Sequence, residues 1–256
     1  MTLWVDVVAR ARGLRTHRLS ASVMTALRAA PDLTAFGRLL KDAGFLVEEG
    51  ERHAAALDVA VRRRAAAELR ILARWCGDRA AELPIVLEDE DRRSLRALLR
   101  ATLQRQPVEL RVRGLVPTPT LPLRALSELA HAQSPADVVT LLTIWNHPFA
   151  NALGPSVHAT TPDPLAMDLA LDRAWAGRAV AGARRGGPEL ERFVADAVDL
   201  TNATTVLTLA GTTGTHAPEF YLEGGHRLSR AAFTALLARD RLAASDALSD
   251  LYHATP

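Results

Sequence analysis

Glycine and proline, the two residues that most often interrupt helices, are absent from the chain between Glu51 and Cys76. Alanine, leucine and arginine, which have high helix propensity, make up most of this run. Gly77 follows directly, and glycine commonly ends helices because it adopts the left-handed backbone conformation without strain. The run therefore predicts one long helix that ends at Gly77, and it favours a helical fold for the whole chain.

Helical segments and breakers alternate along the rest of the sequence. Aromatic residues make up only 5% of the chain and β-branched runs are short, so sheets are disfavoured. Two connectors are rich in proline or glycine, "LVPTPTLPL" at Leu115–Leu123 and "RRGGP" at Arg184–Pro188. We predict an all-α fold, with further helices at about residues 88–105, 123–131, 136–145, 165–183, 189–210, 227–239 and 241–252.

Charge, cysteine content and hydropathy limit the functions open to the chain. With 31 basic and 29 acidic residues the formal net charge is +2, which gives no reason to expect nucleic acid or anionic lipid as a partner. Cys76 is the sole cysteine, so no internal disulfide forms and a reducing compartment fits. No apolar run approaches the ~20 residues of a membrane span, and the N-terminal stretch lacks a signal-peptide core. We expect a soluble, cytoplasmic protein.

The stretch "EDEDRRSLRALLRATLQRQP" (Glu88–Pro107) combines four adjacent acids with a leucine-rich pattern. Its apolar residues have the spacing of one buried helix face; they are Leu95, Leu98, Leu99, Thr102 and Leu103. Glu88 and Asp89 each precede an arginine by four positions, the orientation that favours ion pairs on an exposed helix surface. The stretch predicts the start of a structural helix, and no metal site at its acids.

An enzymatic alternative stays open, because acids followed by arginines resemble the magnesium-diphosphate motif of helical prenyl-transfer enzymes. Such a site needs a second cluster on a facing helix, and the candidate, Asp163, Asp168 and Asp172, is not rich in adjacent acids. The histidines form no i, i+4 pair, and no nucleophile elbow or catalytic triad is recognisable. The sequence therefore favours a protein with no catalytic residue, metal or cofactor over a magnesium-dependent helical enzyme.

A second segment is similar to the acidic stretch. In "VADAVDLTNATTVLTLAG" (Val194–Gly211) two aspartates and an asparagine follow one another at intervals of three. An apolar stripe accompanies them; it consists of Phe193, Ala197, Leu200 and Leu207. Farther away, "SPADVVTLL" (Ser134–Leu142) resembles "APDLTAFGRLL" (Ala30–Leu40). Such self-similarity predicts a repeated helical unit.

In their order and spacing these motifs resemble the C subunit of the archaeal and bacterial V/A-type rotary ATPases, a relative of the d subunit of vacuolar ATPases. "EDEDRRSLRALLRA" is similar to the acidic-start helix of that family, with Ser94 where asparagine is usual. "VDLTNATTVLTLAG" is similar to its second copy; Asn202 matches, whereas Ala203 and Thr208 replace leucine and arginine.

Three further stretches carry the same resemblance. "YLEGGHRLS" has the glycine pair that follows the second helix, at Gly224 and Gly225. "LLTIWNHPFANAL" resembles the turn after the helix of the middle domain, and Arg10 and Arg12 match an arginine-x-arginine near the N-terminus. The similarity runs in order from about residue 4 to 240.

The resemblance implies a mechanical function. Members of that family are helical funnels of three similar domains, which sit on the membrane proteolipid ring, receive the foot of the central shaft and transmit torque without an active site. They usually continue beyond the length at which this sequence stops. We therefore expect a funnel-like array with a partial third domain: N-terminal helical segments over 1–77, a central domain over 78–183 and a partial C-terminal domain over 184–256.

The partners implied by the resemblance are the central shaft subunits of the rotary ATPase and the proteolipid ring, with proton or sodium as the transported ion. The protein would then be cytoplasmic and peripheral to the membrane through those partners, and it would bind no nucleic acid. A stand-alone helical adaptor with the same fold is the other alternative. The residues that we expect to contact a partner lie three or four positions apart on two similar helices; they are Arg92, Arg96, Arg100, Asp199 and Asn202.

Overall fold

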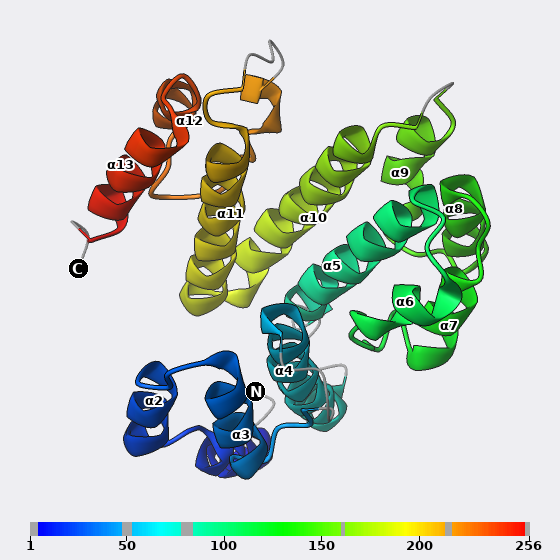
Figure 1. Ribbon diagram of the computed structural model, residues 1–256. Helices are drawn as coiled ribbons and strands as arrows, with labels where there is room; N and C mark the ends of the chain where they lie inside the picture. Colours follow the sequence, from blue (N-terminus) through cyan, green and yellow to red (C-terminus); the bar gives the residue numbers. More distant parts are fainter. Residues whose placement is uncertain (1–4, 48–52, 78–83, 160–161, 213–216, 254–256) are drawn as a thin grey trace. The chain divides into compact units, whose positions relative to one another are not determined.

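The computed structural model describes residues 5–47, 53–77, 84–159, 162–212 and 217–253. Its elements are helices joined by turns and loops (Figure 1). The described part of the chain contains no strand, and the all-α prediction is confirmed. The chain divides into two compact units, residues 1–147 and 148–256, which are described separately below.

The first unit begins with three short helices, α1 (Val5–Leu14), α2 (Ala21–Arg28) and α3 (Leu33–Asp42). Ser20 and Asp32 accept hydrogen bonds from backbone N–H groups in the first turns of α2 and α3, which satisfies donors that a helix leaves unpaired. A small apolar core holds α2 and α3 to the next helix; its buried members are Leu27, Leu40 and Leu57.

Two long helices, α4 (Ala54–Cys76) and α5 (Pro84–Leu103), follow. Gly77 ends α4 with a φ of +53°, so the predicted end of this helix is confirmed. Helix α5 begins at Pro84, before the predicted start at Glu88, because proline is tolerated in the first turn, where its missing N–H has no acceptor. Leu95, Leu98, Leu99 and Thr102 are buried as predicted, whereas Leu103, the last residue of the helix, is only half-buried.

The first unit is completed by three shorter helices, α6 (Val108–Arg113), α7 (Leu123–Ala130) and α8 (Pro135–Ile144). A capping box starts α8, with Ser134 and Asp137 each bonding the other's backbone N–H. The buried Arg111 donates to the carbonyls of Gln106 and Ala130 and so joins α6 to the end of α7.

The second unit contains α9 (Ala150–Val157), α10 (Pro164–Gly186), α11 (Pro188–Leu209), a 3-10 turn at Ala217–Phe220, α12 (Arg230–Leu237) and α13 (Arg241–His253). Gly187 alone separates α10 from α11, and its φ of +92° suits glycine. The two helices lie side by side (Figure 1). Trp175 on α10 is fully buried, and Tyr221 packs edge-to-face on Phe233, with ring centroids 5.4 Å apart.

A similar order of elements occurs in both units. In the first, the long helices α4 and α5 are followed by the short α6, a loop, α7 and α8; in the second, the long helices α10 and α11 are followed by a loop with a 3-10 turn, α12 and α13. The three-part division at 77/78 and 183/184 stays a prediction. The first of these bounds falls at the end of α4 and the second inside α10.

The apolar stripe that the sequence shows on α11 is not the buried face of this helix. Phe193, Leu200 and Leu207 are 42%, 60% and 37% exposed. The buried face is on the other side of the helix and consists of Val194, Val198, Asp199, Asn202, Ala203 and Val206. The reason is that the two polar residues bond a loop of the same unit, and these bonds draw their side of the helix inward.

No helix in the described ranges combines the length and the apolar character that crossing a membrane requires.

Candidate functional site

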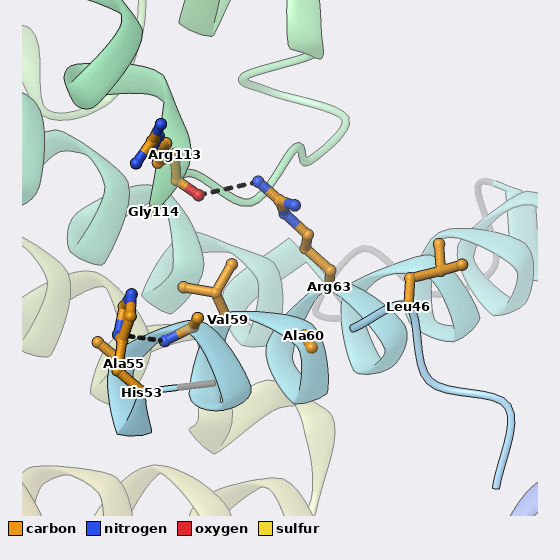
Figure 2. A pocket seen from close by; sticks show the side chains of 9 residues that line it. Leu46, His53, Ala55, Val59, Ala60, Arg63, Arg113 and Gly114 are labelled. Atoms are coloured by element: carbon orange, nitrogen blue, oxygen red, sulfur yellow. Dashed lines mark hydrogen bonds between the residues drawn. The ribbon is translucent and has the colours of Figure 1, made fainter. Parts of the chain in front are cut away.

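Helix α4 lines a hollow of about 200 Å³ in the first unit, between Leu46 on one side and Gly114 on the other (Figure 2). Arg63 crosses it: its guanidinium donates to the carbonyl oxygens of Arg113, at 2.9 Å, and Leu115, at 3.3 Å. The described lining carries no carboxylate. The hollow therefore presents a structural arginine rather than paired acid and base groups, and Arg63 anchors the start of the loop 114–122 to α4.

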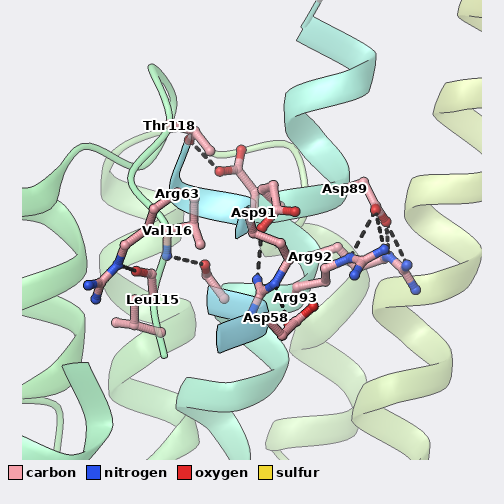
Figure 3. Close-up of polar contacts among 12 residues, drawn as sticks. Asp58, Arg63, Asp89, Asp91, Arg92, Arg93, Leu115, Val116 and Thr118 are labelled. Carbon is pink, nitrogen blue, oxygen red and sulfur yellow. Dashed lines mark hydrogen bonds and ion pairs between the residues drawn. The ribbon is translucent and has the colours of Figure 1, made fainter. Parts of the chain in front are cut away.

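The same loop is fixed to α5 by a buried carboxylate. Asp91 is fully buried and accepts hydrogen bonds from the hydroxyls of Thr118 and Thr120. Three residues later, the Ser94 hydroxyl accepts from the backbone N–H of Val116, at 3.3 Å (Figure 3). His147, itself buried, places its Nε2 3.7 Å from Asp91. Asp91 thus holds the proline-rich loop, instead of facing solvent or a ligand.

An equivalent arrangement occurs on α11 in the second unit. Asp199 is fully buried and accepts hydrogen bonds from three successive backbone N–H groups, those of His226, Arg227 and Leu228, at 2.8–3.1 Å. Asn202, three residues later and also fully buried, donates to the Leu222 carbonyl and accepts from its N–H, both at 2.9 Å. Two polar side chains three residues apart therefore fix the loop 221–229 on this helix.

The glycine pair in that loop is required by this close approach. A Cβ at Gly225 would lie 2.1 Å from Asp199 Oδ1, and one at Gly224 would lie 2.4 Å from Val180. Gly224 also has a φ of +111°, which side chains rarely permit. The pair that carried part of the family resemblance thus has a packing reason: the backbone must reach the carboxylate.

The four acids of Glu88–Asp91 point to different neighbours. Glu90 pairs with Arg62 of α4, at 2.9 Å, while Asp89 pairs with Arg92, at 2.6 Å, and with Arg93, at 2.9 Å. The Asp89–Arg93 pair was predicted, but the Asp89 side chain is only 13% exposed, so the expectation of a solvent-exposed pair is wrong.

The charges around Asp89 set its pKa. Burial by itself raises the pKa of a carboxyl group, but the Coulombic attraction and hydrogen bonds of Arg92 and Arg93 outweigh it and hold the pKa of Asp89 below its usual value. The acid is therefore charged and neutralised within its own helix. Among the residues that the structure describes, no group of three or more histidines, cysteines or acids is placed to hold a metal ion.

The five residues predicted to bind a partner fall into two groups. Arg92, Asp199 and Asn202 are buried, and the hydrogen bonds given above account for the two residues of α11 through their own loop. Arg96 is half-buried and Arg100 is exposed on α5. The structure therefore brings Asp199 and Asn202 together as a loop anchor, and of the other two arginines only Arg100 is exposed. A contact with a partner stays a prediction.

A family model described as ATP synthase (C/AC39) subunit matches residues 7–254. The chain belongs to this family. The match covers both compact units and both helices that carry a buried aspartate, and it confirms the resemblance seen in the motifs. No curated protein compared with the chain matches it significantly.

In this C/AC39 protein, sequence reasoning missed the partners of the two buried aspartates. Thr118 and Thr120 lie in the proline-rich stretch "LVPTPTLPL", whose composition indicates a connector. Nothing in that stretch indicated that the two hydroxyls bond a carboxylate on a helix. On α11 the partners are backbone N–H groups, for which side-chain patterns give no signal. The adjacent Gly224 and Gly225 were the available sign that a backbone approaches another group closely.

Proposed function

We propose that this member of the ATP synthase C/AC39 family is a non-catalytic central-stalk socket of a V/A-type rotary ATPase. It couples the central shaft to the membrane proteolipid ring, and so couples ATP chemistry to proton or sodium transport. The observation that supports this most directly is the family match over residues 7–254. The absence of a catalytic residue or cofactor belongs to the same proposal.

The geometry of the two anchored loops suits a part that carries torque. A loop held only by its ends moves under load, whereas each loop here is fixed near its middle by a buried carboxylate. Hydrogen bonds to a carboxylate are stronger than those between neutral groups. With two such anchors on helices of 20 and 22 residues, force applied to a loop is transmitted to a long helix.

Within this proposal the sequence-predicted contact residues have two roles. Arg96 and Arg100 meet acidic side chains of a partner, because arginine pairs well with carboxylates at a partly exposed surface. Arg92, Asp199 and Asn202 are positioning residues that hold their helices and loops in shape. The protein acts in the cytoplasm, peripheral to the membrane through its protein partners.

Deletion of the gene in the native host tests the proposal. Inverted membrane vesicles from the deletion strain should lose ATP-driven ion uptake, while the detached ATPase head in the soluble fraction still hydrolyses ATP. Complementation with the wild-type chain should restore uptake, and the tagged chain should co-purify with shaft and proteolipid subunits. Unchanged ion uptake after deletion, or purification without any other component of the ATPase, would contradict the socket and favour the stand-alone adaptor.

A charge reversal tests the surface arginines. Arg100→Glu should weaken recovery of the shaft subunits, and the loss should be larger at low salt, because exposed charges are screened as salt rises. Arg124→Glu, an exposed arginine on α7, is the matched control and should behave as wild type. If both variants recovered the shaft subunits equally well, Arg100 would not be part of the contact with the shaft.

A further inference from the structure

A second hollow adjoins the one shown in Figure 2 and lies farther along α4. It has a volume of about 470 Å³ and is enclosed within the first unit by α4, the turn at residues 44–46 and the segment from α6 to α7. Its wall on α4 runs from Ala60 to Arg70, which is about 15 Å at a rise of about 1.5 Å per residue. The hollow is therefore elongated, and its volume suits a small ligand, since ligand sites measure about 300–1,000 Å³.

The walls of this hollow are aliphatic. Leu115 and Leu126 are buried in it, whereas Leu46 and Leu123 form its rim and are 84% and 67% exposed. Its described lining contains no aromatic ring and no carboxylate, and its side chains that can form hydrogen bonds are three arginines and Ser127. A ligand with several polar groups along its body would lose hydrogen bonds to water here without replacing them. A hydrocarbon body would instead cover leucines that now face water, which is favourable.

The three arginines of the lining differ in how their charges are used. Arg63 is bonded to the two carbonyl oxygens described above, and Arg64 pairs with Glu68 at 2.8 Å. Arg70 is half-buried and has neither a hydrogen bond nor an ion pair with any residue that the structure describes. It lies at one end of the wall on α4. Because a guanidinium forms strong, paired hydrogen bonds with a carboxylate, this end of the hollow favours one anionic group.

We propose that this hollow binds a free fatty acid, with its hydrocarbon chain along α4 against the leucines and its carboxylate on Arg70. The aliphatic walls account for the hydrocarbon chain, and the one arginine without a partner in the described residues accounts for a single negative charge at one end of the ligand. The length of the wall on α4 suits a chain of medium length. The proposal adds a ligand to this protein and does not depend on its function in an ATPase.

Calorimetric titration of the full chain with laurate, kept below its micelle concentration, tests the site. Laurate should bind saturably to the wild type. Arg70→Gln should weaken the binding by about tenfold or more, because it removes a charge-assisted pair. Arg74→Gln is the matched control, since Arg74 is an exposed arginine one turn farther along α4 and does not line the hollow. It should bind laurate as wild type does.

Dodecanol, which has the same chain without a charge, separates the contribution of the head from that of the chain. It should bind more weakly than laurate to the wild type, and it should bind Arg70→Gln and the wild type equally. A second variant, Ala67→Phe, places a ring inside the hollow and should weaken the binding of both compounds. Its control is Ala65→Phe, because Ala65 is exposed on α4 and lies outside the lining.

The inference would be overturned if laurate did not bind saturably, if Arg70→Gln bound it as well as Arg74→Gln, or if Ala67→Phe bound it as well as wild type. Equal affinity of the wild type for laurate and dodecanol would also overturn it. Co-sedimentation with phosphatidylglycerol vesicles that Arg70→Gln abolishes, without binding of laurate, would assign Arg70 to a lipid headgroup instead of a free acid. Each of these results leaves the proposed function intact, because co-purification with ATPase subunits is a separate measurement.

Discussion

The carboxylate of Asp199 allows a sharp test of how the second unit is held together. It is fully buried and accepts the N–H groups of His226, Arg227 and Leu228. Asp199→Ala removes the acceptor oxygens of all three hydrogen bonds at once. The Leu228 bond is buried, so its unpaired N–H costs about 1–3 kcal/mol of the free energy of unfolding. The other two bonds are partly buried and cost about 0.5–1.5 kcal/mol each.

The expected destabilisation by Asp199→Ala is therefore about 2–6 kcal/mol, measured by equilibrium unfolding in urea. Asp196→Ala is the control on the same helix, because the side chain of Asp196 is 49% exposed and lies 3.7 Å from His226 Nε2 and 3.9 Å from Arg227 Nε. An exposed pair of this kind contributes about 0–1 kcal/mol.

Amide hydrogen exchange locates the effect. In Asp199→Ala the backbone amides of 226–228 should lose protection, while the Val116 amide, whose acceptor is Ser94 in the first unit, should keep it. The idea that this carboxylate holds the loop would be refuted by either of two results. Asp199→Ala could lower the free energy of unfolding by less than about 1 kcal/mol, or the amides at 226–228 could keep their protection.

Three further predictions concern packing and charge. Gly225→Ala should destabilise the second unit by about 2 kcal/mol or more in urea unfolding, because its Cβ meets Asp199 Oδ1 at 2.1 Å; Gly177→Ala, with open space around it in α10, should instead stabilise by about 0.5–1 kcal/mol. Leu99→Ala should cost about 2–5 kcal/mol in the same assay, since Leu99 is 1% exposed, and a cost under about 1 kcal/mol would contradict its place in the core. The folded state holds the pKa of Asp89 below its usual value, so its contribution to stability is present above the unfolded pKa of about 3.9 and is lost as pH falls through the lower, folded pKa. The difference in free energy of unfolding between wild type and Asp89→Asn, measured in urea, should therefore shrink on acidification. A difference that grew below about pH 4 would contradict a lowered pKa of Asp89.

The helices that the sequence predicted well are those for which composition and spacing agree. From Ala54 to Cys76 helix-favouring residues are unbroken, and Gly77 ends the run in the backbone conformation that glycine favours. On α5 the leucines recur on one side only, so the spacing identified the buried face. Local propensity and one-sided apolar patterning were sufficient in both cases.

The buried face of α11 could not be predicted in this way because the helix has apolar residues on two sides. Val194, Val198 and Val206 lie on one side, and Phe193 and Leu200 lie on the other. Helical spacing alone picks out the stripe through Phe193 and Leu200 and does not show which side of the helix is buried. The deciding interactions come from loop N–H groups more than twenty residues away in the sequence, and helix periodicity holds no information about them.

Short elements were missed for a different reason. Helix α6 has only six residues, which shows too little of the helical period to be recognised. Helix α9 contains Gly154 and Pro155, which in a sequence indicate a break rather than a helix. The anchoring of the loop 114–122 was also beyond reach, because Arg63, Asp91 and Thr118 meet only after α4, α5 and the loop have packed.

The two loop anchors differ in a way that affects how the sequence can change over time. Asp91 is bonded by the side chains of Thr118 and Thr120, so a hydroxyl is needed at both positions and few residues can replace them. Asp199 is bonded by the main chain of His226 and Arg227, whose N–H groups are present whatever side chain is attached. Positions 226 and 227 are therefore open to almost any residue except proline, which has no N–H. The side chains of the second loop can therefore change without loss of its anchor. The anchor of the first loop is lost if either threonine side chain is replaced by one without a hydroxyl.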